Sequence, residues 1–129
     1  MNGVLLDTNA LLWVLAGDPQ LGTGARAHLT TSTSPRYSSA SVLEITIKQM
    51  LGRLEVPGEV ADAAAAAGLV ELPFRSHHAS GLERFPDLAK HDPFDRMLLS
   101  QARHEDLLLL TSDRQLLELG IDWVIDARR

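Results

Sequence analysis

The chain has 129 residues, enough for one hydrophobic core but not two, so we expect a single domain over residues 1–129. Its 45% apolar and 22% charged residues are typical of a globular protein, and the absence of cysteine excludes disulfides, thiolate metal sites and a cysteine nucleophile. The net charge of −5 argues against a broadly basic nucleic-acid-binding surface, although bound divalent cations would neutralise most of that charge.

The first apolar stretch, "GVLLDTNALLWVLAG", is interrupted by Asp7 and is not preceded by a basic residue. A signal peptide has a basic start and an unbroken apolar segment, and a membrane span needs about 20 apolar residues. We therefore expect a cytoplasmic protein that makes no membrane contact.

Short apolar runs alternate with helical periods along the rest of the chain. Strands are predicted over 3–7, from 36, and over 69–73, 106–112 and 122–126. Helices are predicted over 8–17, 23–33, from Ser38, Ser39 or Ser41 to about Leu51, near 58–67, from Ser76 to before Pro86, from Pro93 to about Glu105, and over 113–120. Because the strands are unbroken apolar runs, they suit a parallel sheet that is covered on both faces, which is an α/β sandwich.

Two aspartates stand where a predicted strand ends and a helix begins. Asp7 follows "GVLL", and Asp113 follows "LLLLTS". Either residue can serve as an ordinary helix N-cap, and Thr111 or Ser112 could cap in place of Asp113. Ligands of open parallel sheets bind beyond the carboxyl ends of the strands, so both residues are also candidates for a functional site.

Glu44 is the only charged residue between Arg36 and Lys48. If Leu43, Ile47, Met50, Leu51 and Leu54 form the buried stripe of its helix, Glu44 lies about 100° from that stripe, at the edge of the core. A carboxylate there is costly unless it is paired or binds a metal ion. The alternative is a solvated ion pair with Lys48, worth about 0.3–0.5 kcal/mol.

The segment "HDPFDRMLLSQARH" contains two more aspartates. Pro93 suits the first helical position, which makes Asp92 the expected N-cap. Asp95 then lies in the first turn, where the helix dipole favours an anion by about 0.3–1 kcal/mol. Because the cap is already supplied, Asp95 is the better candidate for a functional residue.

Several carboxylates at one sheet edge would repel each other at neutral pH. A Mg²⁺ or Mn²⁺ ion removes this repulsion, because both ions prefer oxygen ligands. A metal ion held by carboxylates, with a water free to attack, suits the hydrolysis of a phosphodiester.

Four segments in this order resemble a PIN-domain ribonuclease, most closely the VapC-type toxin of bacterial toxin–antitoxin pairs. They are "LLDTNALLW", "ASVLEITIK", "HDPFDRMLLSQA" and "LLLLTSD". The resemblance covers essentially the whole chain. It implies a three-layer α/β/α sandwich with a central parallel sheet in strand order 3-2-1-4-5. It also implies a metal-dependent endoribonuclease toxin, usually a homodimer and possibly part of a larger assembly, that is silenced by a cognate antitoxin.

The resemblance places the four acids of the family on Asp7, Glu44, Asp95 and Asp113, which are therefore the predicted catalytic and metal-binding residues. We expect them to hold one or two Mg²⁺ or Mn²⁺ ions, so that a water activated by the metal attacks phosphorus in line. Asp7 and Asp95 are the expected direct ligands, Glu44 can orient the water, and Asp113 can act through water.

The predicted contacts to RNA phosphates are Arg96, Arg114 and Lys90, which lie close to the acids in sequence. Arg103 fits a solvated helix face better. His91 is assigned to the surface, because a lone histidine before a helix cap is more often a surface residue. The low aromatic content, 5%, does not support recognition of bases by stacking.

The antitoxin is expected to dock on apolar surface of the first two helices and the Glu44 helix, where Leu12, Trp13 and Leu15 supply bulk. An alternative function is a non-catalytic signalling or binding module, similar to a phosphoacceptor receiver, in which the acids serve only as helix caps. The sequence fits a receiver poorly, since a single Asp ends the first strand, "LVELP" has no aspartate, and no lysine follows residue 90.

Overall fold

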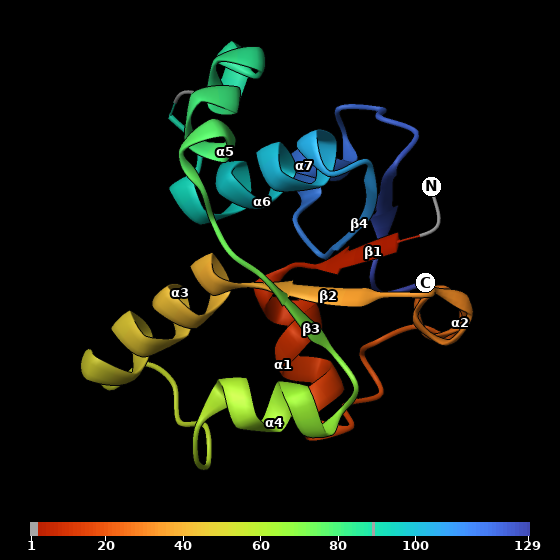
Figure 1. Ribbon diagram of the computed structural model, residues 1–129, viewed down its shortest axis with the longest axis vertical. Helices are drawn as coiled ribbons and strands as arrows, with labels where there is room; N and C mark the ends of the chain where they lie inside the picture. Colours follow the sequence, from red (N-terminus) through yellow and green to blue (C-terminus); the bar gives the residue numbers. More distant parts are fainter. Residues whose placement is uncertain (1–2, 89) are drawn as a thin grey trace.

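The computed structural model describes residues 3–88 and 90–129 (Figure 1). Its centre is a five-stranded parallel sheet in the order β3-β2-β1-β4-β5. The strands are β1 (Gly3–Leu6), β2 (Pro35–Ser38), β3 (Val70–Leu72), β4 (Leu107–Thr111) and β5 (Val124–Asp126). The predicted fold class and strand order are therefore confirmed.

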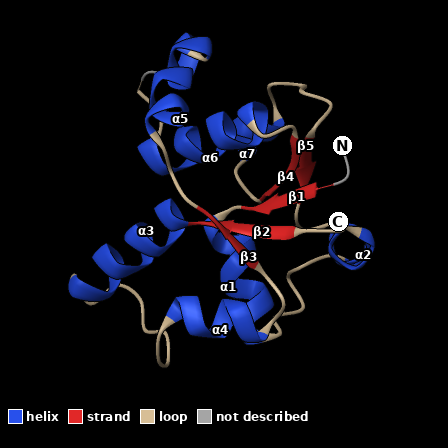
Figure 2. Ribbon diagram, in the orientation of Figure 1, coloured by secondary structure: helices blue, strands red, loops and turns tan. Residues whose placement is uncertain are grey.

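Helices cover both faces of this sheet (Figure 2). The α-helices are α1 (Thr8–Ala16), α2 (Thr23–Thr31), α3 (Ser39–Met50), α4 (Val60–Ala66), α5 (Ser76–Ser80), α6 (Pro93–His104) and α7 (Arg114–Leu117). Two short 3-10 helices, η1 (Gly81–Arg84) and η2 (Pro86–Leu88), connect α5 to the segment before α6. The predicted short helix from Ser76 is thus divided, and its N-cap residue is Arg75 instead of Ser76.

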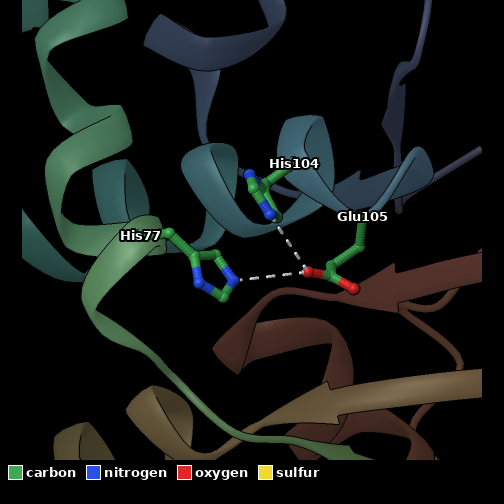
Figure 3. Close-up of side chains that lie close together, drawn as sticks. All are labelled: His77, His104 and Glu105. Atoms are coloured by element: carbon green, nitrogen blue, oxygen red, sulfur yellow. Dashed lines mark ion pairs between the residues drawn. The ribbon is translucent and has the colours of Figure 1, made fainter.

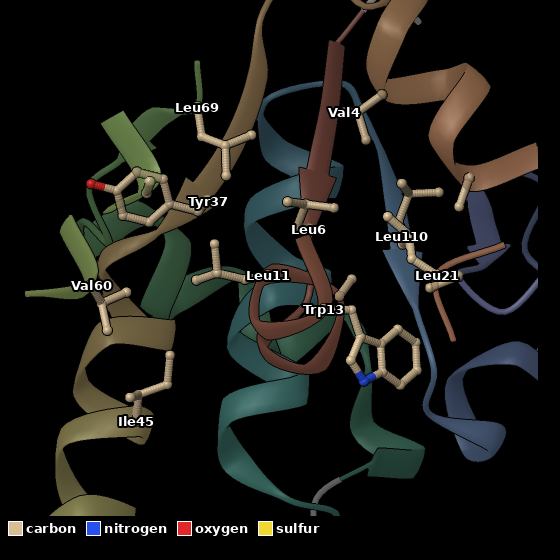
Figure 4. Close-up of a cluster of buried hydrophobic side chains, with 14 residues drawn as sticks. Val4, Leu6, Leu11, Trp13, Leu21, Tyr37, Ile45, Val60, Leu69 and Leu110 are labelled. Carbon is tan, nitrogen blue, oxygen red and sulfur yellow. The ribbon is translucent and has the colours of Figure 1, made fainter. Parts of the chain in front are cut away.

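The unbroken apolar runs are buried on both sides of the sheet, as predicted. Along β1, Val4 and Leu6 pack with α1, α2, α3 and α4, whereas Leu5 packs with α6 and α7 on the other face. Strand β4 divides in the same way, with Leu110 on the first side and Leu109 on the second. Figure 4 shows the core of the first side, where Trp13 lies beneath the sheet. Period-2 alternation turns each apolar strand into two core surfaces.

The predicted buried stripe of α3 is wrong. Its apolar residues face outward, with exposed fractions of 51% for Leu43, 39% for Ile47, 81% for Met50 and 60% for Leu51. The buried residues of α3 are Ala40, Ser41, Glu44 and Ile45.

The buried face of α3 packs against α1 and α6, and two of its four buried residues, Ala40 and Ser41, are small. At the start of the helix, the buried Ser38 hydroxyl caps Ala40 N and also donates to Gln101 Oε1 at 2.5 Å. Periodicity alone could not show which of the two faces of α3 is the inner one.

Among the described residues, no helix has the length and apolar character that crossing a membrane requires.

Candidate active site

An acidic cavity of about 630 Å³ opens at the carboxyl ends of β1 and β4. The four predicted acids, Asp7, Glu44, Asp95 and Asp113, all line it, together with Asp92. They come from the ends of two strands and from helices α3 and α6, so the fold gathers side chains that are up to 106 positions apart in sequence. The rest of the lining is Thr8, Asn9, Lys48, Ser112, Arg114 and Arg128.

Asp7 is the innermost of these acids, with 3% of its surface exposed. One carboxylate oxygen, Oδ1, accepts from Ala10 N at 2.7 Å and thereby caps α1. The other, Oδ2, accepts from Thr111 Oγ1 at 2.8 Å and from Ser112 N at 2.9 Å. Burial raises the pKa of Asp7, against the lowering effect of these donors, and the Glu44 charge raises it further. Asp7 is therefore both a helix cap and a buried acid that faces the cavity.

Asp95 and Asp113 form a coupled pair of carboxyl groups. Burial raises the pKa of Asp95 to about 8, with further increases from its hydrogen bond to Asp113 and from the charges of Asp113, Asp7 and Asp92. For Asp113, burial alone would raise the pKa, but donation from Leu116 N, the hydrogen bond with Asp95 and the nearby His91 lower it overall. The two carboxyl groups are therefore expected to share one proton near neutral pH.

Glu44 is also buried, at 8% exposure. Its Oε1 accepts from the Thr8 hydroxyl at 2.6 Å, and its Oε2 pairs with Lys48 Nζ at 2.8 Å. The ion pair with Lys48 is thus present, but it is not fully solvated, since the Glu44 side chain is only 10% exposed. Its position at the core edge agrees with the sequence prediction, although the buried stripe from which that prediction was made is wrong.

His91 is the main residue that the sequence analysis misplaced. Its side chain is 11% exposed, and its Nε2 lies 3.2 Å from Asp113 Oδ2 and 3.6 Å from Asp95 Oδ2. The three groups are close enough to one another to hold a metal ion. The assignment of His91 to the surface was wrong because η2 and the turn before α6 fold the histidine back onto the acids, and a sequence pattern does not reveal this.

The cations at the cavity are only partly those predicted. Arg114 lines the cavity, whereas Arg96 and Lys90 do not. Lys90 is exposed and borders a neighbouring hollow that also contains His91, and the Nε of Arg96 is buried without a hydrogen-bond partner among the described residues. Arg103 lies on an exposed part of α6, as the sequence analysis favoured.

Lys48 and Arg128 line the cavity without having been predicted. The guanidinium of Arg128 donates to the Ser112 carbonyl at 2.9 Å and lies 5.6 Å above the Trp13 ring. Lys48 was considered only as an ion-pair partner of Glu44. The sequence near Arg128 has no motif from which its position could have been predicted.

Helix capping explains some of these acids but not all. Asp92 accepts from Phe94 N at 2.8 Å and Asp113 accepts from Leu116 N at 2.9 Å, so both are N-caps, as is Asp7. Glu44 and Asp95 cap nothing. Glu44 and Asp95 nevertheless line the same cavity as the three capping acids. Helix capping alone therefore does not explain why all five acids meet there.

The donor set fits a hard divalent cation. Oxygen atoms of five carboxylates line one polar cavity, and the raised pKa of Asp95 reflects first its burial and then the nearby acids Asp113, Asp7 and Asp92. A cation such as Mg²⁺ or Mn²⁺ can replace the proton held between Asp95 and Asp113.

Together, the parallel sheet and the acids at its carboxyl edge define an α/β/α protein with a carboxylate-rich site at the strand ends. The model of a known family, described as the PIN domain, matches residues 4–121. The chain therefore belongs to the PIN domain family, as its four sequence segments indicated. No curated protein sequence matches the chain significantly.

Three solved structures with a similar fold come from toxin–antitoxin proteins. A toxin–antitoxin complex from Klebsiella pneumoniae aligns with a TM-score of 0.67 at 18% identity, over 96% of this chain and 97% of the other. VapBC2 from Rickettsia felis, bound to a DNA fragment from its promoter, aligns with a TM-score of 0.66 at 15% identity, over 95% and 96%. DNA-bound VapBC from Salmonella typhimurium aligns with a TM-score of 0.61 at 21% identity, over 92% of each chain.

Proposed function

We propose that this protein is a metal-dependent endoribonuclease and the toxin of a toxin–antitoxin pair. The observation that carries the proposal is the convergence of Asp7, Glu44, Asp95 and Asp113 on one cavity, with the pKa of Asp95 raised to about 8. Membership of the PIN domain family and the likeness to toxin–antitoxin structures support the same function.

Asp7 and Asp95 would hold the metal ion, and Asp113 and Glu44 would complete its surroundings. When bound, Mg²⁺ or Mn²⁺ supplies a Lewis acid that activates water and offsets negative charge on the phosphate. Asp7 is suited to this role because three hydrogen-bond donors, Ala10 N, Thr111 Oγ1 and Ser112 N, hold the carboxylate in one orientation.

The other residues of the cavity would position the RNA and manage protons. Arg114, Arg128 and Lys48 lie on its wall and can contact phosphate oxygens, while the Thr8 hydroxyl keeps Glu44 oriented toward the cavity. His91 Nε2 lies within 3.6 Å of both Asp95 and Asp113 and can accept the proton that leaves this pair.

The test is cleavage of RNA by the purified full chain with Mn²⁺ or Mg²⁺, with and without EDTA. Asp7→Asn and Asp95→Asn are the informative variants, because an asparagine at position 7 keeps the cap to Ala10 N while removing the charge. Asp62→Asn, an exposed acid on α4, is the matched control. Activity that persists with EDTA, or in both site variants, would contradict the proposed mechanism.

The partner we propose is a cognate antitoxin, as in the three similar complexes. Of the surface predicted for it, Trp13 belongs to the core, and Leu12 and Leu15 are partly buried against that core. The outward row of α3, formed by Leu43, Ile47, Met50 and Leu51, is the larger exposed apolar surface on these helices. Figure 1 shows α3 extending away from the sheet. The exposed fractions of these four residues show that the row is accessible.

Co-purification with the product of a neighbouring antitoxin gene tests this partner. Met50→Glu combined with Leu51→Glu should release the antitoxin from the row. Gln115→Glu adds a charge at an exposed polar position on α7, on the other face of the sheet, and serves as control. Undiminished co-purification of the double variant would place the antitoxin elsewhere. Light scattering of the toxin alone tests the predicted homodimer.

A further inference from the structure

A second cluster of ligating side chains lies at the opposite end of α6 from Asp95. It comprises His77 on α5, His104 at the last position of α6, and Glu105, which caps that helix (Figure 3). None of the three lines the acidic cavity. The function proposed above makes no use of them.

The three side chains converge on one point. His77 Nε2 and His104 Nε2 each lie 3.9 Å from Glu105 Oε2, and the three ligand atoms are all within 4.8 Å of one another. Figure 3 shows both imidazoles directed at the same carboxylate oxygen. Ligands of a tetrahedral Zn²⁺ lie about 3.3 Å apart, so the cluster needs to contract by roughly 0.6–1.5 Å. Both imidazoles are about half exposed and can rotate to do so.

A buried histidine holds the carboxylate of this cluster in place. His78 is fully buried, and its Nδ1 accepts from Arg75 N at 2.9 Å, so the proton of the neutral ring is on Nε2. That Nε2 donates to Glu105 Oε2 at 3.0 Å. The same hydrogen bond is the main reason that the pKa of Glu105 is lowered. An oriented carboxylate supported by a buried donor is typical of the surroundings of a metal ligand.

The helix dipole favours a cation at this position, and a neighbouring cavity leaves room for water. The cluster lies at the C-terminal end of the 12-residue α6, where the helix dipole stabilises positive charge. A cavity of about 500 Å³ adjoins the two imidazoles, and Ser80, Gly81 and Arg103 lie on its wall. This cavity has room for a water molecule beside the histidines.

We infer that His77, His104 and Glu105 form a second metal site, specific for a divalent transition ion of the Zn²⁺ type, with water as the fourth ligand. Two imidazoles and one carboxylate are a ligand set of zinc, and nitrogen ligands disfavour Mg²⁺. The bound ion joins α5 to the end of α6. The site is separate from the acidic cavity, so it can be present whether or not the protein is a nuclease.

Calorimetric titration of the metal-free full chain with ZnCl₂ tests the inference. We expect His77→Ala combined with His104→Ala to weaken one zinc site by about 100-fold or more, while Asp95→Asn retains that site. Glu105→Gln keeps an oxygen acceptor for His78 Nε2 but loses the charged ligand, and it should weaken binding by about 10–100-fold. His28→Ala, on α2, is the matched control and should bind zinc as the original chain does.

Two further measurements identify the ligands and the consequence for the fold. Co²⁺ should give the strong visible absorption of a tetrahedral site in the original chain and in Asp95→Asn, but not in the double histidine variant. In Asp95→Asn, Zn²⁺ should raise the midpoint of thermal unfolding, and adding His77→Ala and His104→Ala to that variant should remove most of the rise. Unchanged zinc binding in both the double variant and Glu105→Gln would overturn the inference, as would a Co²⁺ spectrum that is not tetrahedral.

Discussion

Asp92 and Asp95 are three positions apart and of the same residue type, but their surroundings differ. Asp92 is exposed and accepts from Phe94 N as the cap of α6. Asp95 is partly buried against Asp113 and His91. The cap at Asp92 and the proline after it start the helix, and the helix directs Asp95 into the cavity.

Single substitutions of Asp92 and Asp95 should therefore give opposite results. Asp95→Asn should abolish RNA cleavage and leave the fold intact, because it removes a predicted metal ligand without removing a cap. Asp92→Ala should lower the free energy of unfolding by about 1 kcal/mol through the lost N-cap and retain most of the activity. Cleavage rates and urea unfolding of both variants measure this, and the reverse pattern would show that the roles are exchanged.

The raised pKa of Asp95 predicts the pH dependence of stability in metal-free protein. Burial raises this pKa from 3.8 to about 8, so the native state binds a proton more tightly than the unfolded chain does. The contribution of this proton to the free energy of unfolding is fully present below pH 3.8 and is lost as the pH rises through about 8. The free energy of unfolding should accordingly decline across this range.

Asp95→Asn should flatten that decline and stabilise the metal-free protein by roughly 1–3 kcal/mol near pH 8, since it leaves no charge to bury. Urea unfolding at several pH values between about 4 and 8 measures the slope. A slope that is the same in the variant and the original chain would mean that Asp95 keeps an ordinary pKa.

At the scale of single elements, α3 shows how packing can reverse an amphipathic pattern. Leu43, Ile47 and Met50 face outward, whereas the face that includes Ser41, Glu44 and Ile45 packs on α1 and α6. Glu44 belongs to this inner face, and its charged side chain therefore lines the cavity.

Truncating one residue on each face of α3 should distinguish the two faces. Ile45→Ala should lower the free energy of unfolding by roughly 2–5 kcal/mol, because Ile45 is completely buried. Met50→Ala should change it by no more than about 0.5 kcal/mol, because Met50 is 81% exposed. Denaturant unfolding of the isolated protein measures both values. A large loss from Met50→Ala alone would indicate that this face is buried, for example in a dimer.

At the scale of the whole molecule, the last residues connect α2 to the acidic cavity. Gly22 N donates to the Ala127 carbonyl at 2.9 Å, and Gly24 N donates to the Arg129 carbonyl at 2.8 Å. Between these contacts, Arg128 extends to Ser112 at the cavity. Contacts at the start of α2 thus help to place a cation on the wall of the candidate active site.

Gly22→Ala should disturb this connection. A Cβ on Gly22 would lie 2.2 Å from the carbonyl carbon of Arg129, so the backbone there must shift. We expect a loss of roughly 1–3 kcal/mol in stability and faster hydrogen exchange of Ala127 N, which is bonded to Thr111 O. Thr23→Ala, at the exposed next position, is the control and should leave this exchange unchanged.

The order of strands and helices follows from local patterns in the chain. Unbroken apolar strands, the caps Asp7 and Asp92, and Gly17 at a positive φ of 62° are short-range features, and each agrees with the structure. The positions of Asp7 and Asp113 at the strand ends follow from the same patterns, because parallel strands end at one edge of the sheet. The resemblance to the PIN domain added the strand order and distinguished Asp95 from Asp92.

Three other features depend on how the elements pack and could not be predicted from local patterns. They are the inward fold of His91, the outward face of α3, and the meeting of His77 with His104 and Glu105. Each depends on the relative placement of segments joined by turns or separated by a helix. Hydrophobic period and capping describe a single element, whereas the distance between two elements results from the packing of all the side chains between them.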